Sequence, residues 1–441
     1  MRAEDIKTPS NILLGIIWFL SLISIFVDLP ILKMLNGLIL IAYISLVVWF
    51  IRRSLKILCL ILGVITIAIA TATDGWHWAW SGIEKATLFS AFFGTLSLLR
   101  STADARPEIQ RASLSVERLS GAERDSGLLV GTFFLGSTLI VGVMAIFAPI
   151  VGEKASLESR KNAAEACQRG MCLACLWSPF WVAMAISSEH LPNVPLWQII
   201  LSGLSLATLG LITAQILYTP RVGLRALLRA IISFYPVLPP VTLTALVVLA
   251  LNGFTTLSTL QCLVLGVPAL CVTGLAFMGL EKLLRSLKEA GAGLGTIQGE
   301  IVLLTTSFAL GRLLQFLLET EENGNWMSNL SLAPYAIICF GVAFMTLLAF
   351  IGIHQIVTLT IVLVAFTNPS FGIDQLVLMQ TGLLGWAFAS MIGLSAVSVA
   401  AASTMFQVPL EQLAYGSNVK FVFIFGFIGV ATILLINEML T

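Results

Sequence analysis

Residues 170–188 read Gly-Met-Cys-Leu-Ala-Cys-Leu-Trp-Ser-Pro-Phe-Trp-Val-Ala-Met-Ala-Ile-Ser-Ser, and the motif Val194-Pro195-Leu196-Trp197-Gln198 follows shortly after them. A shift of 215 positions brings this stretch onto a second copy that begins at Gly385 and shares five identical residues. With one deletion allowed, the second copy also carries Val408-Pro409-Leu410-x-Gln412. Because both copies hold this motif at nearly the same offset, we interpret the chain as a duplication of about half its length.

Composition places the duplicated chain in a membrane. Of its 441 residues, 58% are hydrophobic and 11% are charged, whereas about 25% are charged in a typical soluble domain. The apolar runs, of roughly 17 to 25 residues, suit helices that cross a bilayer, and no alternating strands of the barrel type occur. We therefore expect an all-α polytopic protein with about 10–12 transmembrane segments, multi-pass in a cell inner membrane. The net charge of +1 gives no sign of a nucleic-acid partner.

The first spans and their orientation follow from hydropathy and from basic residues. The candidate spans are 11–27, 35–51, 56–73 and 83–99. Basic residues near position 52 and the five arginines of 100–126 place those two connections in the cytoplasm. The connection 74–82, with three tryptophans, then lies outside and resembles an interfacial aromatic belt. Pro107 could start a surface helix within 100–126, and a solvated loop is the alternative.

The next part of the chain contains an odd number of apolar segments between two cytoplasmic ends. The three segments are 127–150, 168–190 and 197–217. An even number of crossings is needed, so one segment does not cross. Ser178-Pro179 interrupts the second segment, because proline removes a helical hydrogen bond. A break of the first segment at Pro149 is the alternative, and the sequence leaves both open.

The second half supplies the counterpart spans. They are 228–251, 256–280, 299–318, 330–350, 351–366, 375–404 and 419–437. Span 83–99 runs inward on this count, whereas its counterpart 299–318 runs outward, so the halves are predicted to be inverted repeats. The expected domains are N-terminal scaffold helices at 1–82, a first repeat core at 83–217, linking scaffold helices at 218–298 and a second repeat core at 299–441.

Two residues are candidates for ion coupling. His354 lies in an apolar stretch, where ionisable groups are costly and often functional. An imidazole titrates near neutral pH and could carry a proton, with Thr358 one helical turn away. A structural histidine satisfied by a neighbouring helix is the equal alternative. Glu84, Glu300 and Arg312 are expected to be interfacial groups.

Hydroxyl and small residues recur in both copies and form the predicted substrate site. A broken helix near the bilayer centre would direct free N–H groups toward an anion, and glycine would allow close approach of the backbone. Serine and threonine also hold membrane helices together, so a single hydroxyl is weak evidence. The candidates are Ser178, Pro179, Ser187, Ser188, Gly393, Ser395, Ser398, Ser403 and Thr404.

Motifs for enzymatic or cofactor chemistry were not found in the sequence. Cys172-x-x-Cys175 has a metal-like spacing but lies in an apolar run, so we expect neither a metal site nor a cofactor. The seven cysteines are expected to be small packing residues. No phosphate-binding loop, dinucleotide fingerprint or nucleophile elbow occurs, and we do not expect an enzyme.

The inverted duplication, the interrupted segments, Ser178-Pro179-Phe180 and Gly352-Ile353-His354 together resemble the ion transporter superfamily over most of residues 83–437. This group includes dicarboxylate, citrate and gluconate carriers and some sodium/proton antiporters. The resemblance implies a scaffold domain, a mobile transport domain with two hairpins, elevator-like motion and a possible homodimer. Neither hairpin carries the Ser-Asn-Thr of the dicarboxylate branch, which argues against a sodium-dicarboxylate assignment.

The leading functional hypothesis is a secondary active transporter of a small anion, either a carboxylate or an inorganic oxyanion, coupled to H+ or Na+. A cation/proton antiporter on the same scaffold is the alternative, although the apolar segments show no obvious carboxylate. A membrane enzyme or flippase of envelope biosynthesis would be expected to have larger polar loops outside the membrane.

Overall fold

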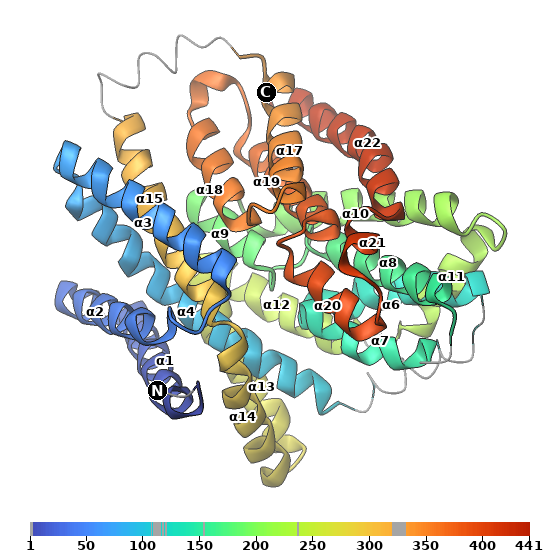
Figure 1. Ribbon diagram of the computed structural model, residues 1–441, viewed down its shortest axis with the longest axis horizontal. Helices are drawn as coiled ribbons and strands as arrows, with labels where there is room; N and C mark the ends of the chain where they lie inside the picture. The colour runs from blue at the N-terminus through green and yellow to red at the C-terminus, as the bar shows by residue number, and fades with distance from the viewer. Residues whose placement is uncertain are drawn as a thin grey trace. The chain divides into compact units, whose positions relative to one another are not determined.

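The computed structural model describes residues 3–106, 108, 116, 119, 121–152, 155–235, 238–319 and 332–441. These residues are almost entirely helical, which confirms the expected all-α polytopic fold (Figure 1). Nine of the described helical segments are long and apolar enough to cross a membrane, or up to ten with one bent pair, Gly223–Ser233 and Leu238–Phe254. The surface arm considered around Pro107 lies largely outside the described residues.

Contacts divide the chain into two compact units, and each half of the sequence contributes to both. Unit 1 comprises Met1–Ala105 and Ala250–Ser331, and unit 2 comprises Arg106–Leu249 and Leu332–Thr441. The helices of unit 1 are α1 (Ala3–Phe26), α2 (Pro30–Val47), α3 (Arg53–Thr73), α4 (Trp76–Asp104), α13 (Thr259–Phe277), α14 (Leu280–Gly293) and α15 (Gln298–Glu319). Helix α12 (Leu238–Phe254) contains the junction between the second and the first unit.

Unit 2 contains the segments that the sequence repeats. Its first-copy helices are α6 (Gly121–Leu139), the 3-10 turn η1 (Ile140–Gly142), α7 (Val143–Val151), α8 (Leu157–Ala174), α9 (Val182–His190), α10 (Leu196–Tyr218) and α11 (Gly223–Ser233). Its second-copy helices are α17 (Pro334–Phe350), α18 (Gln355–Phe366), α19 (Gln375–Ile392), α20 (Val397–Phe406), α21 (Leu410–Ala414) and α22 (Ser417–Leu440). The first copy is teal to green and the second orange to red in Figure 1.

Unit 1 is organised around the pair α4 and α15. The ring of Trp78 stacks on Phe316, with the ring centroids 5.0 Å apart, while Phe89 further along α4 meets Phe308 earlier in α15. The two helices are therefore antiparallel, as the opposite directions of spans 83–99 and 299–318 predicted. Helix α3 packs on α15 and α13 packs on α4. Contacts thus place α4 and α15 in unit 1 together with α1, α2, α3, α13 and α14, and the expected division into scaffold helices and repeat cores stays a prediction.

Helix boundaries in unit 2 reproduce the shift of 215 positions seen in the sequence. Helix α20 begins at Val397 and α9 at Val182, and α18 begins at Gln355 where η1 begins at Ile140. The two Val-Pro-Leu motifs also coincide, because Pro195 is the N-cap of α10 and Pro409 is the N-cap of α21. The duplication is therefore visible in the structure as well as in the sequence.

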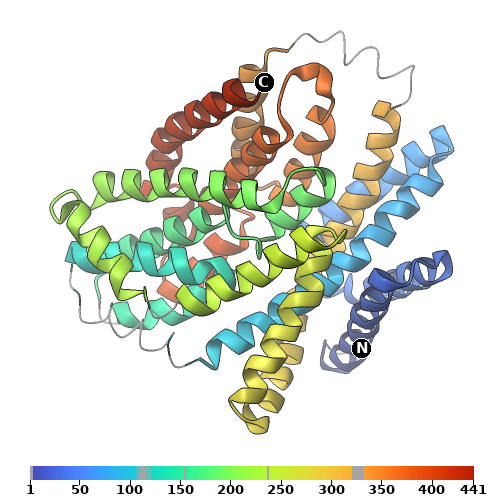
Figure 2. The same ribbon diagram turned by 180° about the vertical axis from the view of Figure 1, so that it is seen from behind.

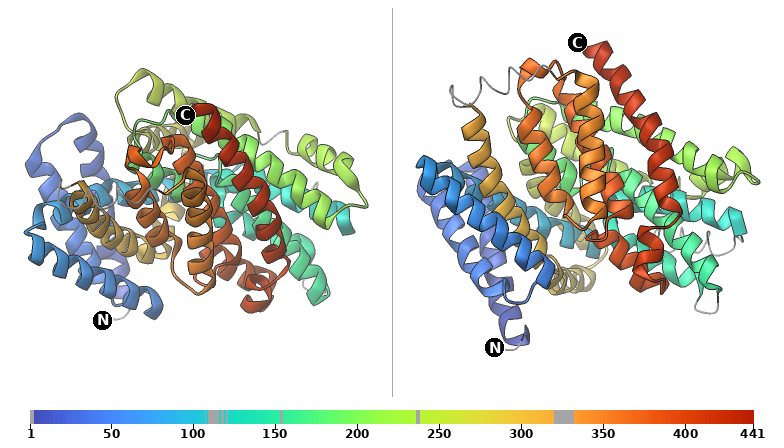
Figure 3. Two further views of the ribbon diagram at one scale, coloured as in Figure 1. Left: turned by 90° about the horizontal axis from the view of Figure 1, so that it is seen from above. Right: turned by 45° about the horizontal axis from the view of Figure 1, so that its top comes forward.

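Contacts between the copies show that they are inverted relative to each other. As α10 advances from Leu206 through Gly210 to Tyr218, its neighbours on α22 recede from Gly429 through Phe425 to Ser417. The equivalent helices α10 and α22, green and dark red in Figures 1 and 2, therefore pack on each other in opposite directions. In each copy the first helix packs on the broken one, α6 on α8 and α17 on α19. Figure 3 gives two further views of these helices. This pattern is that of an inverted repeat.

By helix length and composition, two of the three apolar segments of the first copy could cross a membrane. Residues 121–151 and 196–218 qualify as spans, with Pro149 inside α7. Helices α8 and α9 do not meet the same criteria, because α9 has nine residues and α8, although long enough, is rich in charged residues. Seven non-helical residues, which include Ser178-Pro179, separate the two helices. This pattern favours the interruption at Ser178-Pro179 over a break at Pro149 as the place where the first copy fails to cross.

The inverted packing predicts opposite membrane sides for two exposed residues. Arg225 follows the C-terminal end of α10 in a basic connection, and α22 starts at that same end. Its 24 residues span about 36 Å, so Met439 should emerge on the other face. In a Cys339→Ser background, which removes the one exposed native cysteine of the described residues, Arg225→Cys should label from inside and Met439→Cys from outside. Labelling of both from one face would contradict the arrangement.

Candidate functional site

Two helix breaks, one in each copy, lie at the centre of unit 2. Helix α8 ends at Ala174 and α9 starts at Val182, whereas α19 ends at Ile392 and α20 starts at Val397. The first break contains the expected interruption at Ser178-Pro179, and the second contains Gly393 and Ser395, which the sequence analysis named as site candidates. The broken segments cross each other, because α8 contacts both α19 and α20, and α9 contacts α19.

Each break is fixed by carbonyl groups at the end of the first helix of its own copy. In the second copy, Leu394 N–H donates to the Ala349 carbonyl at 3.2 Å. The counterpart of Leu394 in the first copy is Pro179, which has no N–H to donate. The Ser178 hydroxyl donates instead to the Ser137 carbonyl at 2.6 Å, and the Trp181 ring N–H donates to Gly136 at 3.2 Å. Each copy therefore joins its break to the first helix by hydrogen bonds, but the donor groups differ between the copies.

A glycine lets a neighbouring helix approach the first break. A Cβ atom at Gly203 of α10 would lie 1.8 Å from the Leu176 carbonyl oxygen, a distance that no side chain can occupy. The α10 backbone therefore lies directly against the non-helical residues. This close packing leaves no room for a side chain and therefore requires glycine at position 203.

The helices that follow the breaks begin without side-chain caps. Trp181 and Ala396 are the N-cap residues of α9 and α20, and neither makes a capping hydrogen bond from its side chain. The first N–H groups of a helix have no partner within the helix, and together they carry a partial positive charge. Two such N-termini, from oppositely directed copies, therefore lie within one unit.

The predicted hydroxyl residues fall into two groups. The side chains of Ser187, Ser188 and Ser395 have buried hydroxyl oxygens with no hydrogen-bond partner among the described residues. The other hydroxyls donate to backbone carbonyls: Ser178 to Ser137, Ser398 to Ser390, Ser403 to Val408 and Thr404 to Ala400. The first group retains free hydrogen-bonding capacity for a ligand, and the second already has partners within the protein. The ligand role of all seven remains a prediction.

The two backbone candidates lie in the breaks themselves. Pro179 is in the first break, and Gly393 opens the second, where a Cβ atom would lie 3.2 Å from Ala349 Cβ and 3.3 Å from its carbonyl oxygen. Gly393 is thus packed against α17, which leaves little room for a side chain. The substrate-binding role of both residues stays a prediction.

The two coupling candidates lie at the start of α18, His354 as its N-cap residue and Thr358 in its first turn. His354 is the N-cap residue, 4% exposed, and its Nδ1 accepts the Ile356 N–H at 3.3 Å. The Thr358 hydroxyl donates to the Gln355 carbonyl at 3.2 Å. Gln355 was not singled out from the sequence, yet its Nε2 donates to Ser390 Oγ of the broken helix α19 at 3.3 Å. Its Oε1 is buried and has no partner in the described part of the chain.

The three interfacial candidates belong to unit 1, where Glu84 and Arg312 interact with tryptophans and Glu300 lies in the first turn of α15. Trp80 Nε1 donates to Glu84 Oε1 at 2.8 Å, and the Arg312 guanidinium lies 5.6 Å from the centre of the Trp78 ring. Trp76 is half exposed, whereas Trp78 stacks on Phe316. The expected aromatic belt is therefore partly a packing cluster.

Sequence reasoning missed two buried charged residues of α8. Glu165 is 1% exposed and Arg169 is 4% exposed. The predicted apolar segment, 168–190, includes Arg169 but not Glu165, and the sequence analysis singled out neither residue. Helix α8 begins earlier, at Leu157, and buries its polar second half against α6 and α22. The spacing of Glu165, Gln168 and Arg169, which places them on one helical face, was the available signal.

Comparison with known proteins gives a likeness of fold. No family model matches the chain. No curated protein matches its sequence. Among solved structures, the crystal structure of the YdaH transporter from Alcanivorax borkumensis is similar, with a TM-score of 0.50 and 12% sequence identity over 90% of this chain and 97% of that one.

The conserved feature in that comparison is architecture, since 12% identity carries no residue roles from one chain to the other. The narrower resemblance to the ion transporter superfamily remains a prediction. The chain is a multi-pass membrane protein with nine candidate spans among its described residues and the fold of a known transporter.

The close approach at Gly203 predicts a strong effect of a single methyl group. Gly203→Ala should lower the melting temperature of the purified protein, because overpacking of this kind costs about 1–3 kcal/mol. Gly63→Ala is the matched control, since a Cβ at Gly63 in α3 meets nothing within 4 Å. It should be neutral or slightly stabilising, by up to about 1 kcal/mol. Equal melting temperatures for the two variants in a thermal scan would contradict the packing described for the break.

Proposed function

We propose that the chain is a secondary active transporter of a small anion, with its substrate site between the two helix breaks. The observation that carries the proposal is the pair of uncapped N-termini, α9 and α20, supplied by inverted copies within one unit. The likeness to a transporter of the same architecture supports it. Inverted repeats with discontinuous helices are the usual construction of carriers that work by alternating access.

The chemistry of the breaks favours an anion. Backbone N–H groups at a helix N-terminus bind carboxylate or oxyanion groups without a cationic side chain. The unpartnered hydroxyls of Ser187, Ser188 and Ser395 can donate additional hydrogen bonds. A buried hydroxyl without a partner is costly, so a bound ligand that accepts from it gains free energy. A carboxylate or an inorganic oxyanion fits these donors.

The inverted copies also suit movement between two states. Inverted repeats are related by a pseudo-two-fold axis in the plane of the membrane. If the two copies exchange their conformations, the substrate site that was open to one face of the membrane becomes open to the other face. Coupling to H+ or Na+ would make such transport concentrative. His354, buried at the start of α18 and linked through Gln355 to α19, is our candidate for a residue that senses the coupling proton.

A cation/proton antiporter is the second candidate, because one specific observation favours it. Such a carrier needs a buried carboxylate, and Glu165 is buried in unit 2. Uptake of labelled carboxylates and oxyanions by proteoliposomes distinguishes the two, since an antiporter would exchange cations and take up none of these anions.

The unpartnered hydroxyls predict which substitutions affect transport. Ser188→Ala and Ser395→Ala should each raise the KM for the transported anion about tenfold, because a hydrogen bond to a charged group contributes about 1.5–3 kcal/mol. Thr404→Ala is the control, since Thr404 is exposed and its hydroxyl donates to Ala400. The measurement is initial uptake in proteoliposomes against a panel of carboxylates and oxyanions. An unchanged KM in both serine variants would place the substrate elsewhere.

A further inference from the structure

A buried arginine on α8 has one edge of its guanidinium without a partner. Arg169 is 4% exposed, and its guanidinium lies 3.9 Å from the centre of the Tyr218 ring of α10. Its Nη1 donates to Asn418 Oδ1 at 2.7 Å and to Ser417 Oγ at 3.3 Å, both at the start of α22. Its Nε is buried and makes no hydrogen bond to any described residue. Within the same residues, Nη2 makes no hydrogen bond either.

The geometry of the unpartnered donors matches a particular kind of acceptor. The Nε and Nη2 groups form one side of the planar guanidinium, and their N–H bonds match the two oxygens of a carboxylate or a similar oxyanion. Tyr218 covers a face of the plane, and Asn418 takes Nη1, so this side is the part of Arg169 that remains for a ligand. A bidentate pair of this kind is short, strong and specific.

A cavity of about 110 Å³ lies beside Arg169. Its lining comes from α6, α8, α10 and α22, which all belong to unit 2. The charged and polar residues of the lining include Asp125, Asn162, Glu165, Arg169, Tyr218 and Ser417. The volume has room for several water-sized groups, and therefore for an anion of a few non-hydrogen atoms.

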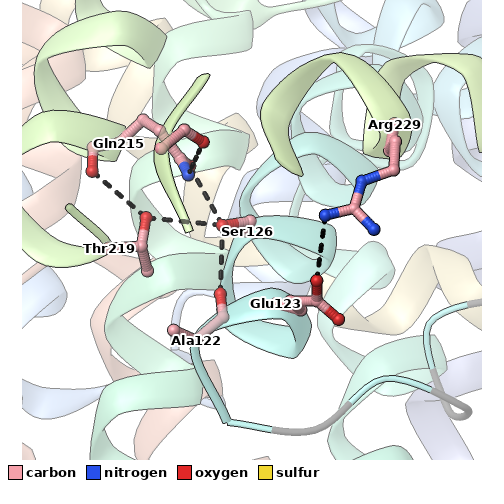
Figure 4. A network of polar contacts seen from close by, with 7 residues as sticks. Ala122, Glu123, Ser126, Gln215, Thr219 and Arg229 are labelled. Carbon is pink, nitrogen blue, oxygen red and sulfur yellow. Dashed lines mark hydrogen bonds and ion pairs between the residues drawn. The ribbon is translucent and has the colours of Figure 1, made fainter. Parts of the chain in front are cut away.

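Contacts between α6, α10 and α11 hold one wall of the cavity in place. Ser126 Oγ makes hydrogen bonds with Gln215 Oε1 at 3.0 Å and with Thr219 Oγ1 at 3.3 Å, and Thr219 lines the cavity (Figure 4). Nearby, Arg229 of α11 pairs with Glu123 of α6 at 3.0 Å (Figure 4). The protein forms this wall by its own contacts, which lowers the cost of ordering on binding.

Both carboxylates of the lining already have partners. Glu165 accepts the Ser417 N–H at 2.8 Å and also the Ser417 hydroxyl, at the N-terminus of α22, where a carboxylate is favourable. Asp125 pairs with Arg124 at 3.4 Å. No ion pair involves Arg169 in the part of the chain that the structure describes. The guanidinium is therefore the charge of the lining that still needs a counter-ion.

The second copy shows that this charge is not needed to join the helices. Gln380 and Leu384 of α19 lie 215 positions after Glu165 and Arg169. Gln380 Nε2 donates to the Ile199 carbonyl near the start of α10 at 3.0 Å. An amide and an apolar residue are therefore sufficient at the equivalent positions. Burial of an unpaired charge costs several kcal/mol, so the guanidinium of the first copy has a purpose beyond packing.

We propose that the cavity binds a monovalent carboxylate or planar oxyanion of a few non-hydrogen atoms, held by the Nε and Nη2 groups of Arg169. One negative charge balances the guanidinium, whereas a second would face Glu165 without compensation. The exposed Asn162 lies in the lining, so the anion can enter from there. Arg169 lies more than one helical turn before the end of α8 at Ala174, so this site is distinct from the substrate site proposed between the breaks. It therefore goes beyond the proposed function.

The test measures protection of a cysteine in the cavity. In a Cys339→Ser background, Asn162→Cys places a thiol on the exposed part of the lining, and the other native cysteines of the described residues are buried. The purified full-length protein is treated with a water-soluble thiol reagent at increasing acetate or nitrate, with chloride making up a constant ionic strength. Acetate or nitrate should slow the modification in a saturable manner. Chloride is a single atom and cannot pair with both donors.

Arg169→Leu, introduced beside Asn162→Cys, is the variant that tests the ligand contact. It copies Leu384 and should fold, which its melting temperature checks. The half-protecting concentration should rise about tenfold or more, equivalent to about 1.4 kcal/mol. Arg169→Lys should also weaken protection, because lysine keeps the charge but lacks the paired donors. The matched control is Glu158→Cys in the Cys339→Ser background, since Glu158 is exposed on α8 outside the lining, and the anions should not protect it.

Two results would overturn the assignment: acetate and nitrate that leave Asn162→Cys unprotected, or protection that is unchanged in both Arg169 variants. The thiol reports on the cavity alone, so the outcome is separate from that of the uptake assay. Protection of Asn162→Cys in a protein that takes up no anion would reject the proposed function and leave this site. Uptake without such protection would do the reverse.

Discussion

A backbone N–H group in an apolar environment must find a hydrogen-bond partner, and this constraint governs unit 2. Helix breaks inside a membrane protein expose such groups, which is tolerable only where protein or a polar cavity surrounds them. In each copy, the carbonyls that end the first helix accept hydrogen bonds from residues in the break. The N-cap side chains of α9 and α20 make no hydrogen bonds to the first N–H groups of these helices. These N–H groups are therefore candidates for ligand binding.

The inverted duplication turns one such break into a pair. The equivalent helices α10 and α22 are antiparallel. A group that faces one side of the membrane in the first copy therefore has its counterpart facing the other side in the second copy. The copies have diverged in polarity while they kept their geometry. Glu165 and Gln380 occupy equivalent positions and both hold a broken helix to the other copy, yet Glu165 is followed one turn later by Arg169 and Gln380 by Leu384.

Much of the fold was predictable because it depends on apolar periodicity and on the repeat. The breaks at Ser178-Pro179 and near Gly393 were expected, since proline and glycine interrupt helices for local reasons. The grouping of α4 and α15 in unit 1 was not, because it depends on tertiary packing that no local pattern encodes. The contacts of Glu165 and Arg169 were not predictable either, because they depend on partners in α22, far away in the sequence.

The central claim is that both breaks contribute to one substrate site. Cysteines placed singly at Ser178, in the first break, and at Ser395, in the second, in a Cys339→Ser background, can be titrated with a water-soluble thiol reagent in the presence of whichever anion of the panel the wild type transports. The account predicts that the anion slows modification at both positions with the same half-saturating concentration, because a single ligand covers both. Protection at one position only, or at neither, would contradict a shared site.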